Sequence, residues 1–238
     1  MFIDLITTAD HVTPEHIKNS TAIIVDVLRA TSVIITALKN GAKSVVPVIS
    51  VEEALKTRKK LENVILGGER KAKKIEGFDL SNSPSEYTHT VVHGKNVIIT
   101  TTNGTKAITR SGSANHIYIG GLLNAKAVAH KAHQIGKSVV IVNAGTDGLF
   151  SMDDFIASGA IIKDLMDLGP CQLSDLAQTA LVIYENYPDI FTYIEKARHY
   201  EILMGLGLEE DIKFCMQKDV YDIVPEYKNG IIKLSKEI

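Results

Sequence analysis

The chain has 238 residues, 45% of them hydrophobic and 23% charged, which is enough to bury a substantial core and argues against disorder. A formal net charge of −2 with interspersed signs excludes a basic nucleic-acid-binding face. No apolar run approaches the roughly 20 residues of a membrane helix, no leader pattern is present, and Cys171 and Cys215 form no CxxC pair. We therefore expect a cytoplasmic protein with a small-molecule partner and no nucleic-acid or membrane partner. The oligomeric state stays open, with a homo-oligomer as one option.

The pattern of apolar residues predicts strands that alternate with helices. Strands are expected at 2–7, 22–26, 44–48, 63–66, 96–100, 116–119, 138–142, 221–224 and 231–234. Helices are expected at 32–40, 51–60, 105–110, 124–135, 152–168, 174–186, 188–204 and 209–218. A further helix is expected to start at Ser83, with Pro84 in its first position and Glu86 completing a capping box. This order indicates a three-layer α/β/α fold with a mainly parallel or mixed sheet.

Two parts of the chain follow the same order of elements. Residues 20–70 can be laid on 94–144 at an offset of 74, which takes Thr31 to Thr105. Four elements keep this offset, so we predict an internal duplication of βαβ units; identities are few, and the generic βαβ rhythm is the alternative. The expected parts are a first α/β unit at 1–90, a second at 91–170 and a mainly helical part at 171–238 on the same core, with soft borders or as one domain.

Polar residues follow four of the predicted strands. In open parallel sheets, ligands bind outside the carboxyl ends of the strands, so we expect these residues to form one site. They are Asp26 with Arg29, Thr31 and Ser32; Glu69 and Arg70 after a Gly-Gly turn; Thr100 to Thr105; and Asn143 to Asp147 followed by Asp153 and Asp154.

The residue types in these clusters favour phosphate chemistry. Hydroxyl and N–H groups at helix N-termini bind anions, and Arg29 can add a bidentate contact. Carboxylates beside a phosphate would repel it unless a cation lies between them, and Mg²⁺ commonly binds one or two carboxylates plus phosphate oxygens. The sequence contains no GxxxxGK[ST], GxGxxG, HExxH or GxSxG motif, which weakens the nucleotide-binding, zinc-peptidase and serine-hydrolase alternatives.

Five blocks in order, with later residues, resemble the 2-phosphosulfolactate phosphatase family. They are Val25 to Thr31, Leu66 to Arg70, Gly77 to Pro84, Thr101 to Thr105, and the later Ala144-Gly145 and Asp153-Asp154. The resemblance implies a Mg²⁺-dependent phosphatase that converts (2R)-phospho-3-sulfolactate to 3-sulfolactate and phosphate, a step of coenzyme M biosynthesis. By this resemblance we would expect Cys and Glu where Asn143 and Asp153 stand, a departure that leaves the substrate more open than the reaction type.

The roles of individual residues are a hypothesis from their chemistry. Catalysis is assigned to Asp26, Arg29 and Glu69. Phosphate binding is assigned to Arg29, Thr31, Ser32, Thr102, Asn103, Gly104 and Thr105; Mg²⁺ binding to Asp26, Glu69 and Asp154; further substrate contacts to Arg70, Asn82, Ser83 and His199. Whether Asp26 attacks phosphorus or a metal-activated water does so stays open, with water preferred.

Structural roles are the alternative for each of these residues: strand end, ion-pair partner, helix cap or structural histidine. Three other functions also remain open. A phosphatase of another small phosphorylated hydroxy acid would keep the mechanism. A sugar-phosphate isomerase or lyase would use Glu69 as its base and release no phosphate. A non-catalytic sensor of phosphorylated metabolites would not need carboxylates beside its anion site, so the sequence favours an enzyme.

Overall fold

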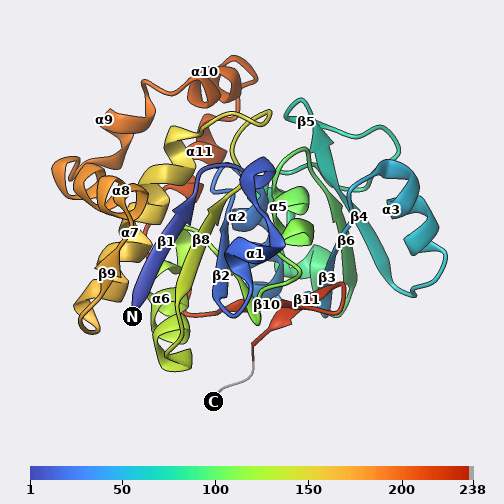
Figure 1. Ribbon diagram of the computed structural model, residues 1–238. Coiled ribbons are helices and arrows are strands. Elements are labelled where there is room, and N and C mark those ends of the chain that lie inside the picture. Colours follow the sequence, from blue (N-terminus) through green and yellow to red (C-terminus); the bar gives the residue numbers. More distant parts are fainter. Residues whose placement is uncertain (236–238) are drawn as a thin grey trace.

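The structure is a computed structural model in which residues 1–235 are described (Figure 1). The strands are β1 (Phe2–Ile6), β2 (Thr21–Val25), β3 (Ser44–Pro47), β4 (Val64–Arg70), β5 (Lys73–Lys74), β6 (Asn96–Thr100), β7 (His116–Gly120), β8 (Val139–Asn143), β9 (Gln172–Leu173), β10 (Pro225–Lys228) and β11 (Ile231–Leu234). The helices are α1 (Pro14–Ile17), α2 (Ala30–Lys39), α3 (Val51–Arg58), α4 (His89–Val92), α5 (Gly104–Arg110), α6 (Ala125–Ile135), α7 (Met152–Asp167), α8 (Asp175–Asn186), α9 (Ile190–Ile194), α10 (Arg198–Gly205) and α11 (Glu209–Cys215). Short 3₁₀ turns lie at Ala9–His11, Pro84–Glu86 and Leu122–Asn124. The predicted α/β class is confirmed.

The strands form one mixed sheet in the order β5-β4-β6-β3-β11-β10-β7-β2-β8-β1-β9. The pairs β4-β6, β6-β3, β7-β2, β2-β8, β8-β1 and β1-β9 are parallel. The β10-β11 hairpin is antiparallel, and a single residue pair joins it to each neighbouring block, Glu226 to Tyr118 and Ile232 to Val45. This hairpin therefore connects two parallel blocks.

The order of the strands has a symmetry that matches the predicted repeat. On one side of the hairpin the order is β4-β6-β3, and on the other it is β8-β2-β7. The offset of 74 pairs β2 with β6, β3 with β7 and β4 with β8, so the central strand of each block comes from the other copy. The strands of the three predicted parts of the chain are thus interleaved in one sheet.

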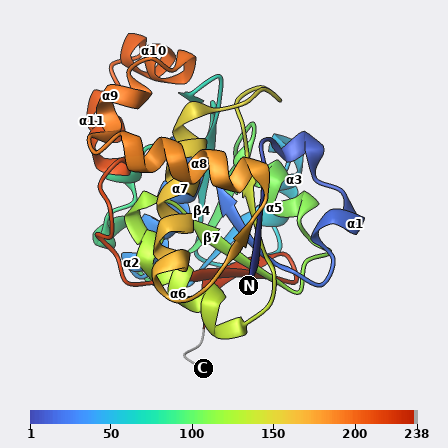
Figure 2. The ribbon, with the colours of Figure 1, turned by 60° about the vertical axis from the view of Figure 1, so that its left-hand side comes forward.

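Both faces of the sheet are buried under helices. Along β2, Ile23 and Val25 pack in the core cluster that contains α6, α7 and α8, whereas Ala22 and Ile24 pack in the cluster that contains α2 and α5. This second cluster also includes residues of β3 and β6, so α2 and α5 are covered by both blocks and lie at the centre of the molecule (Figure 1). Turning the molecule brings α6, α7 and α8 forward over their face of the sheet (Figure 2).

Two predicted elements are wrong at the C-terminal end. The helix expected at 188–204 is interrupted, because Ala197 has extended backbone between α9 and α10. The strand expected at 221–224 lies instead at 225–228, whereas the predicted strand 231–234 is confirmed. Asn229 and Gly230 both have positive φ and form a two-residue hairpin loop, which fixes Lys228 opposite Ile231.

Two other expectations are wrong near the predicted site. Glu69 and Arg70 belong to β4 rather than to a turn, because pairing with β6 continues to Gly68 and pairing with β5 then holds the two residues. The predicted capping box does not form. The Ser83 hydroxyl bonds to Asp211, the Glu86 carboxylate accepts from the N–H and hydroxyl of Ser81, and a single 3₁₀ turn follows.

Among the helices within residues 1–235, none has both the length and the apolar character that crossing a membrane requires.

Candidate functional site

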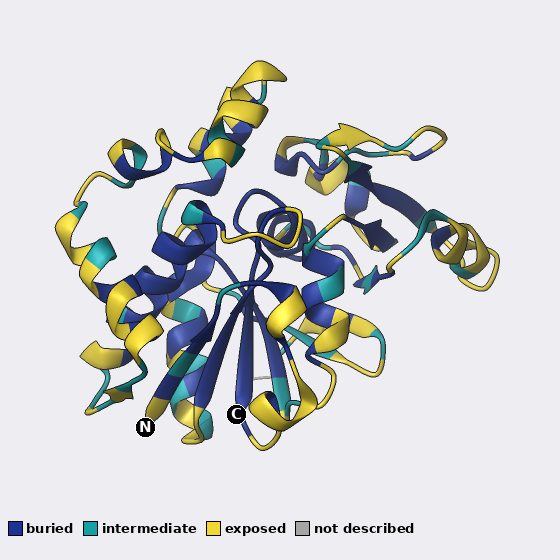
Figure 3. Cartoon of the chain, turned by 45° about the horizontal axis from the view of Figure 1, so that its top comes forward, coloured by how far each residue is buried: buried dark blue, intermediate teal, exposed yellow. Residues whose placement is uncertain are grey.

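A pocket of about 440 Å³ lies where several strand ends meet α10. Figure 3 shows α10 and the β4–β5 turn on opposite sides of the loops that follow the central strands. The lining residues are Asp26, Leu28, Arg29, Glu69, Arg70, Lys71, Ala72, Asn82, Thr101, Thr102, Asn103, Thr146, Asp147, His199, Ile202 and Leu203. The loops after β2, β4, β6 and β8 all contribute, as the sequence pattern predicts.

Asp26 follows β2 directly and is 7% exposed. Its Oδ1 accepts the Ala30 N–H at 3.1 Å, and its Oδ2 accepts no hydrogen bond from the described residues. Burial raises the pKa of Asp26 to about 6; the Ala30 N–H and the charge of His199 oppose this shift, and the charges of Asp153 and Glu69 add to it. Asp26 is therefore a desolvated carboxylate with one oxygen available to a ligand.

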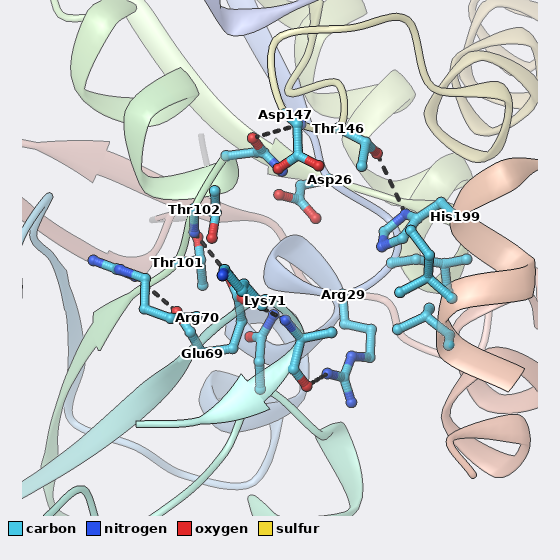
Figure 4. Close-up of a pocket in the computed structure, with 16 residues that line it drawn as sticks. Asp26, Arg29, Glu69, Arg70, Lys71, Thr101, Thr102, Thr146, Asp147 and His199 are labelled. Atoms are coloured by element: carbon cyan, nitrogen blue, oxygen red, sulfur yellow. Dashed lines mark hydrogen bonds between the residues drawn. The ribbon is translucent and has the colours of Figure 1, made fainter. Parts of the chain in front are cut away.

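Glu69 reaches the same pocket from the end of β4. Its two oxygens accept the N–H groups of Thr102 at 2.7 Å and Ala72 at 2.8 Å. The side chain therefore joins the β4–β5 turn to the loop after β6 (Figure 4). Each oxygen keeps a second lone pair for a ligand.

Arg29 lines the pocket, but its charge is partly used inside the protein. The guanidinium forms a buried ion pair with Asp211 of α11 and also donates to the Ala72 carbonyl at 3.1 Å. The second oxygen of Asp211 accepts the Ser83 hydroxyl at 2.6 Å. The network ties α11, the Ser83 loop and the β4–β5 turn to the start of α2. Of the predicted substrate contacts, Ser83 therefore lies behind the pocket wall.

The other three predicted substrate contacts line the pocket in different ways. The Arg70 guanidinium donates to the Glu69 carbonyl and the Thr100 hydroxyl, and Figure 4 shows it turned away from Asp26. Asn82 is 4% exposed, and its Oδ1 has no hydrogen-bond partner within the described residues. A buried amide without a partner is costly, so this group is suited to a ligand. The third residue, His199, lies on the α10 side.

His199 is held by the start of α7. Its Nδ1 lies 3.2 Å from Asp153 Oδ2 and 3.5 Å from the Thr146 hydroxyl. Burial alone would lower the pKa of His199, but the hydrogen bond and charge of Asp153, together with the charge of Asp26, raise it overall. The pocket therefore contains a histidine that favours its charged form.

Several predicted phosphate contacts do not line the pocket with their side chains. The buried hydroxyls of Thr31, Ser32 and Thr105 donate to the carbonyls of Asp26, Val27 and Thr101. Gly104 packs against the start of α2, where an added Cβ would lie 2.7 Å from Asp26 Oδ2 and 2.5 Å from Ala30 Cβ. Thr102 and Asn103 do line the pocket.

Asp154 is also outside the pocket lining, although it was predicted as a metal ligand. Its two oxygens accept the N–H groups of Val27 at 2.9 Å and Gly145 at 3.0 Å. Burial raises its pKa well above the usual range, and the charges of Asp153 and Asp26 add to this shift. Its observed contacts join the loops after β2 and β8.

Sequence reasoning missed several lining and supporting residues. Ile202 and Leu203 follow His199 by three and four positions on α10, a helical spacing that could have revealed them. Thr146 and Asp147 belong to the polar run at 143–147, in which the sequence pattern alone indicates no role for either residue. Asp211 lies 182 positions from Arg29, and no local pattern marks it.

The chain was also compared with known proteins. A family model described as 2-phosphosulpholactate phosphatase matches residues 6–230. Three relatives carry the name probable 2-phosphosulfolactate phosphatase. That of Clostridium acetobutylicum is 54% identical over 234 residues (98% of this chain, 100% of the relative), that of Clostridium beijerinckii 52% over 235 residues (98% and 99%), and that of Clostridium kluyveri 52% over 239 residues (100% of both). Matches over nearly the whole of each chain show that this protein belongs to the 2-phosphosulfolactate phosphatase family.

Proposed function

We propose that the protein is a Mg²⁺-dependent phosphatase that hydrolyses (2R)-2-phospho-3-sulfolactate to 3-sulfolactate and phosphate, the step type found in coenzyme M biosynthesis. The observation that carries the proposal is a pocket in which the carboxylates of Asp26 and Glu69 lie beside cationic side chains, in a member of this family. We place this activity in the cytoplasm, because Cys171 and Cys215 form no disulfide.

The donor set supports a cation that is shared with the substrate. Residues 1–235 contain no cluster of three or more His, Cys, Asp or Glu side chains that could hold a metal alone. Mg²⁺ commonly uses one or two carboxylates together with phosphate oxygens and water, and Asp26 and Glu69 offer two. Asp26 Oδ2 is the better placed donor because it has no protein partner among these residues. When bound, Mg²⁺ would offset the charge that develops on the transferred phosphoryl group.

The chain's own residues would bind and orient the substrate. The Lys71 ammonium brings positive charge to the anionic ester, and the Arg29 guanidinium can donate its remaining N–H groups while it stays paired with Asp211. Asn82 lines the pocket, and its side-chain NH₂ can donate to an acid oxygen. Ile202 and Leu203 add apolar surface to the α10 side of the pocket. Together with a bound Mg²⁺, these groups would offset the charge of a small, multiply anionic substrate.

Phosphate release tests this function directly. We would incubate the protein with racemic phosphosulfolactate, phospholactate and a panel of common phosphomonoesters, each with Mg²⁺ and with EDTA. The expected result is Mg²⁺-dependent release from phosphosulfolactate. Release from a different ester would keep the mechanism and change the substrate. Conversion of a sugar phosphate without phosphate release would favour an isomerase or lyase, and binding without turnover would favour a sensor.

A further inference from the structure

His199 has one ring nitrogen fixed by the protein and one directed into the pocket. Nδ1 faces Asp153 Oδ2 at 3.2 Å and the Thr146 hydroxyl at 3.5 Å. Figure 4 shows the ring lying between Thr146 and the pocket, with its second nitrogen on the side of Asp26. Among residues 1–235, no group forms a hydrogen bond with this Nε2. A ring held in this way presents Nε2 to whatever occupies the pocket.

Asp153, the residue that holds the ring, is itself held. It is 1% exposed, and while Oδ2 faces His199, its Oδ1 accepts a hydrogen bond from the Ser151 hydroxyl. A carboxylate fixed at both oxygens determines which imidazole nitrogen faces it and stabilises the ring when it is charged. In that state Nε2 carries a proton that it can give to a ligand.

The proposed substrate needs such a proton. Its leaving group is an alcohol oxygen, and an alkoxide is a poor leaving group unless it is protonated as the P–O bond breaks. The groups assigned above to phosphate and metal binding supply no proton at that oxygen. The Arg29 guanidinium is already engaged by Asp211 and the Ala72 carbonyl.

We propose that His199 is the general acid of this hydrolysis and that Asp153 is its positioning residue. The inference rests on the proposed function. As the oxygen of water forms its bond to phosphorus, the bond between phosphorus and the ester oxygen breaks, and the Nε2 proton moves to that ester oxygen. The products are the hydroxy acid and phosphate, and a proton lost from the attacking water restores the imidazolium.

A pair of substrates that differ in their leaving group tests this role. One is 2-phospho-3-sulfolactate, and the other is its analogue with sulfur in place of the bridging oxygen. A thiolate leaves without protonation because thiols have a pKa near 8.5, far below that of an alcohol. His199→Gln should lower kcat for the oxygen ester by about 10²–10⁴-fold and for the sulfur analogue by less than about tenfold. Asp153→Asn should show the same selectivity with a smaller loss.

His16→Gln is the matched control. His16 also pairs with an aspartate, Asp4 at 2.6 Å, but its side chain is 41% exposed and it does not line the pocket. This variant should hydrolyse both esters at the wild-type rate. If circular dichroism shows that His199→Gln is poorly folded, His199→Ala assayed with added imidazole takes its place. Imidazole should then restore turnover of the oxygen ester and leave that of the sulfur analogue unchanged.

The outcomes separate the inference from the function on which it rests. Equal losses for the two esters in His199→Gln, with active wild type, would mean that His199 only binds substrate, and the inference would be wrong while the phosphatase function stands. Failure of imidazole to restore the oxygen ester in His199→Ala would also contradict it. If the wild-type protein released phosphate from neither ester, the proposed phosphatase function would be wrong. The inference about His199 would then fail because it rests on that function.

Discussion

At the scale of single residues, Asp26 combines a proposed functional role with a cost in stability. Its pKa is raised by burial to about 6 from the ordinary value of 3.8, so the folded state binds this proton more tightly than the unfolded chain does. Stability from this group is fully present below pH 3.8 and is lost as the pH rises to about 6. A carboxylate kept in spite of that loss is typical of a functional site.

Asp26→Asn should therefore change activity and stability in opposite directions. We expect phosphate release to be nearly abolished, because the proposed Mg²⁺ contact is removed. In EDTA at pH 8, the free energy of unfolding should rise by on the order of 1–3 kcal/mol, and this gain should disappear below about pH 4. Urea titrations at both pH values measure it. Activity within about threefold of wild type, or an equal gain at both pH values, would contradict the assignment.

The Arg29–Asp211 ion pair should matter more for stability than any surface pair. Both side chains are buried, so Asp211→Ala leaves a guanidinium without its counter-charge and should lower the free energy of unfolding by about 3–5 kcal/mol. Asp222→Ala is the matched control, since Asp222 pairs with Lys39 at 3.0 Å but is 89% exposed. Asp222→Ala should leave the free energy of unfolding close to the wild-type value, because solvent screens an exposed pair. Equal losses in the two variants by chemical denaturation would refute this account.

Part of the candidate site was predictable at this scale. Asp26 and Glu69 were found because a carboxylate at the end of a buried strand is unusual unless it binds something. The hydroxyls of Thr31 and Thr105 were assigned to phosphate because capping and anion binding use the same groups, and only the three-dimensional structure shows that they bond to carbonyls of their own loops. Asp211 reaches Arg29 through tertiary packing, which leaves no trace in local spacing.

At the scale of elements, the contact between the starts of α2 and α5 sets the position of Asp26. An added Cβ at Gly104 would meet Ala30 and Asp26 at 2.5 and 2.7 Å, which forces the two helices apart. Gly104→Ala should lower the free energy of unfolding by about 1–3 kcal/mol. It should also lower phosphate release by up to about 10²-fold, because small displacements of catalytic groups are costly.

Gly205→Ala provides the control for this prediction. Gly205 ends α10, and an added Cβ there meets no atom within 4 Å. Alanine favours helix over glycine, so this variant should be as stable as wild type or up to about 1 kcal/mol more stable. Wild-type behaviour of Gly104→Ala in both thermal unfolding and phosphate release would show that the contact does not hold the site.

Strands and helices were predictable from the sequence where the local order of apolar residues defines them. Strands such as β2 and β8 carry continuous apolar runs, and helices such as α6 and α7 show the expected periodicity. The break between α9 and α10 has no Gly or Pro to signal it, so the helix predicted at 188–204 was drawn through Ala197. The Asn229-Gly230 dipeptide was a usable hairpin signal that would have corrected the strand before it.

At the scale of the whole molecule, the interleaved sheet predicts that the two α/β units of the chain depend on each other for folding. Strand β6 lies between β3 and β4, and β2 lies between β7 and β8. Sequence similarity between two segments can suggest a repeat. It cannot show that the central strand of each block belongs to the other segment of the chain. The pocket reflects the same arrangement, because Asp26 and Glu69 come from the first part of the chain and Asp147 and His199 from the later part.

Cutting the chain near the predicted border at residue 90 tests this dependence. A cut after Gly94 lies in an exposed turn and separates β1–β5 from β6–β11. Residues 1–94 lack the partner between β3 and β4, and residues 95–238 lack the partner between β7 and β8. Each fragment alone should therefore be largely unfolded by circular dichroism and by the dispersion of its amide NMR signals.

Co-expression of the two fragments should restore both the fold and the pocket. Phosphate release should then occur in the co-purified complex and in neither fragment, because Asp26 and Glu69 lie on one fragment and His199 on the other. If residues 1–94 alone were folded and unfolded cooperatively, β3 and β4 would not need β6 between them. The observed strand order would then be contradicted. If instead the two fragments fold only together, each α/β unit needs a strand from the other, and the pocket needs residues from both fragments.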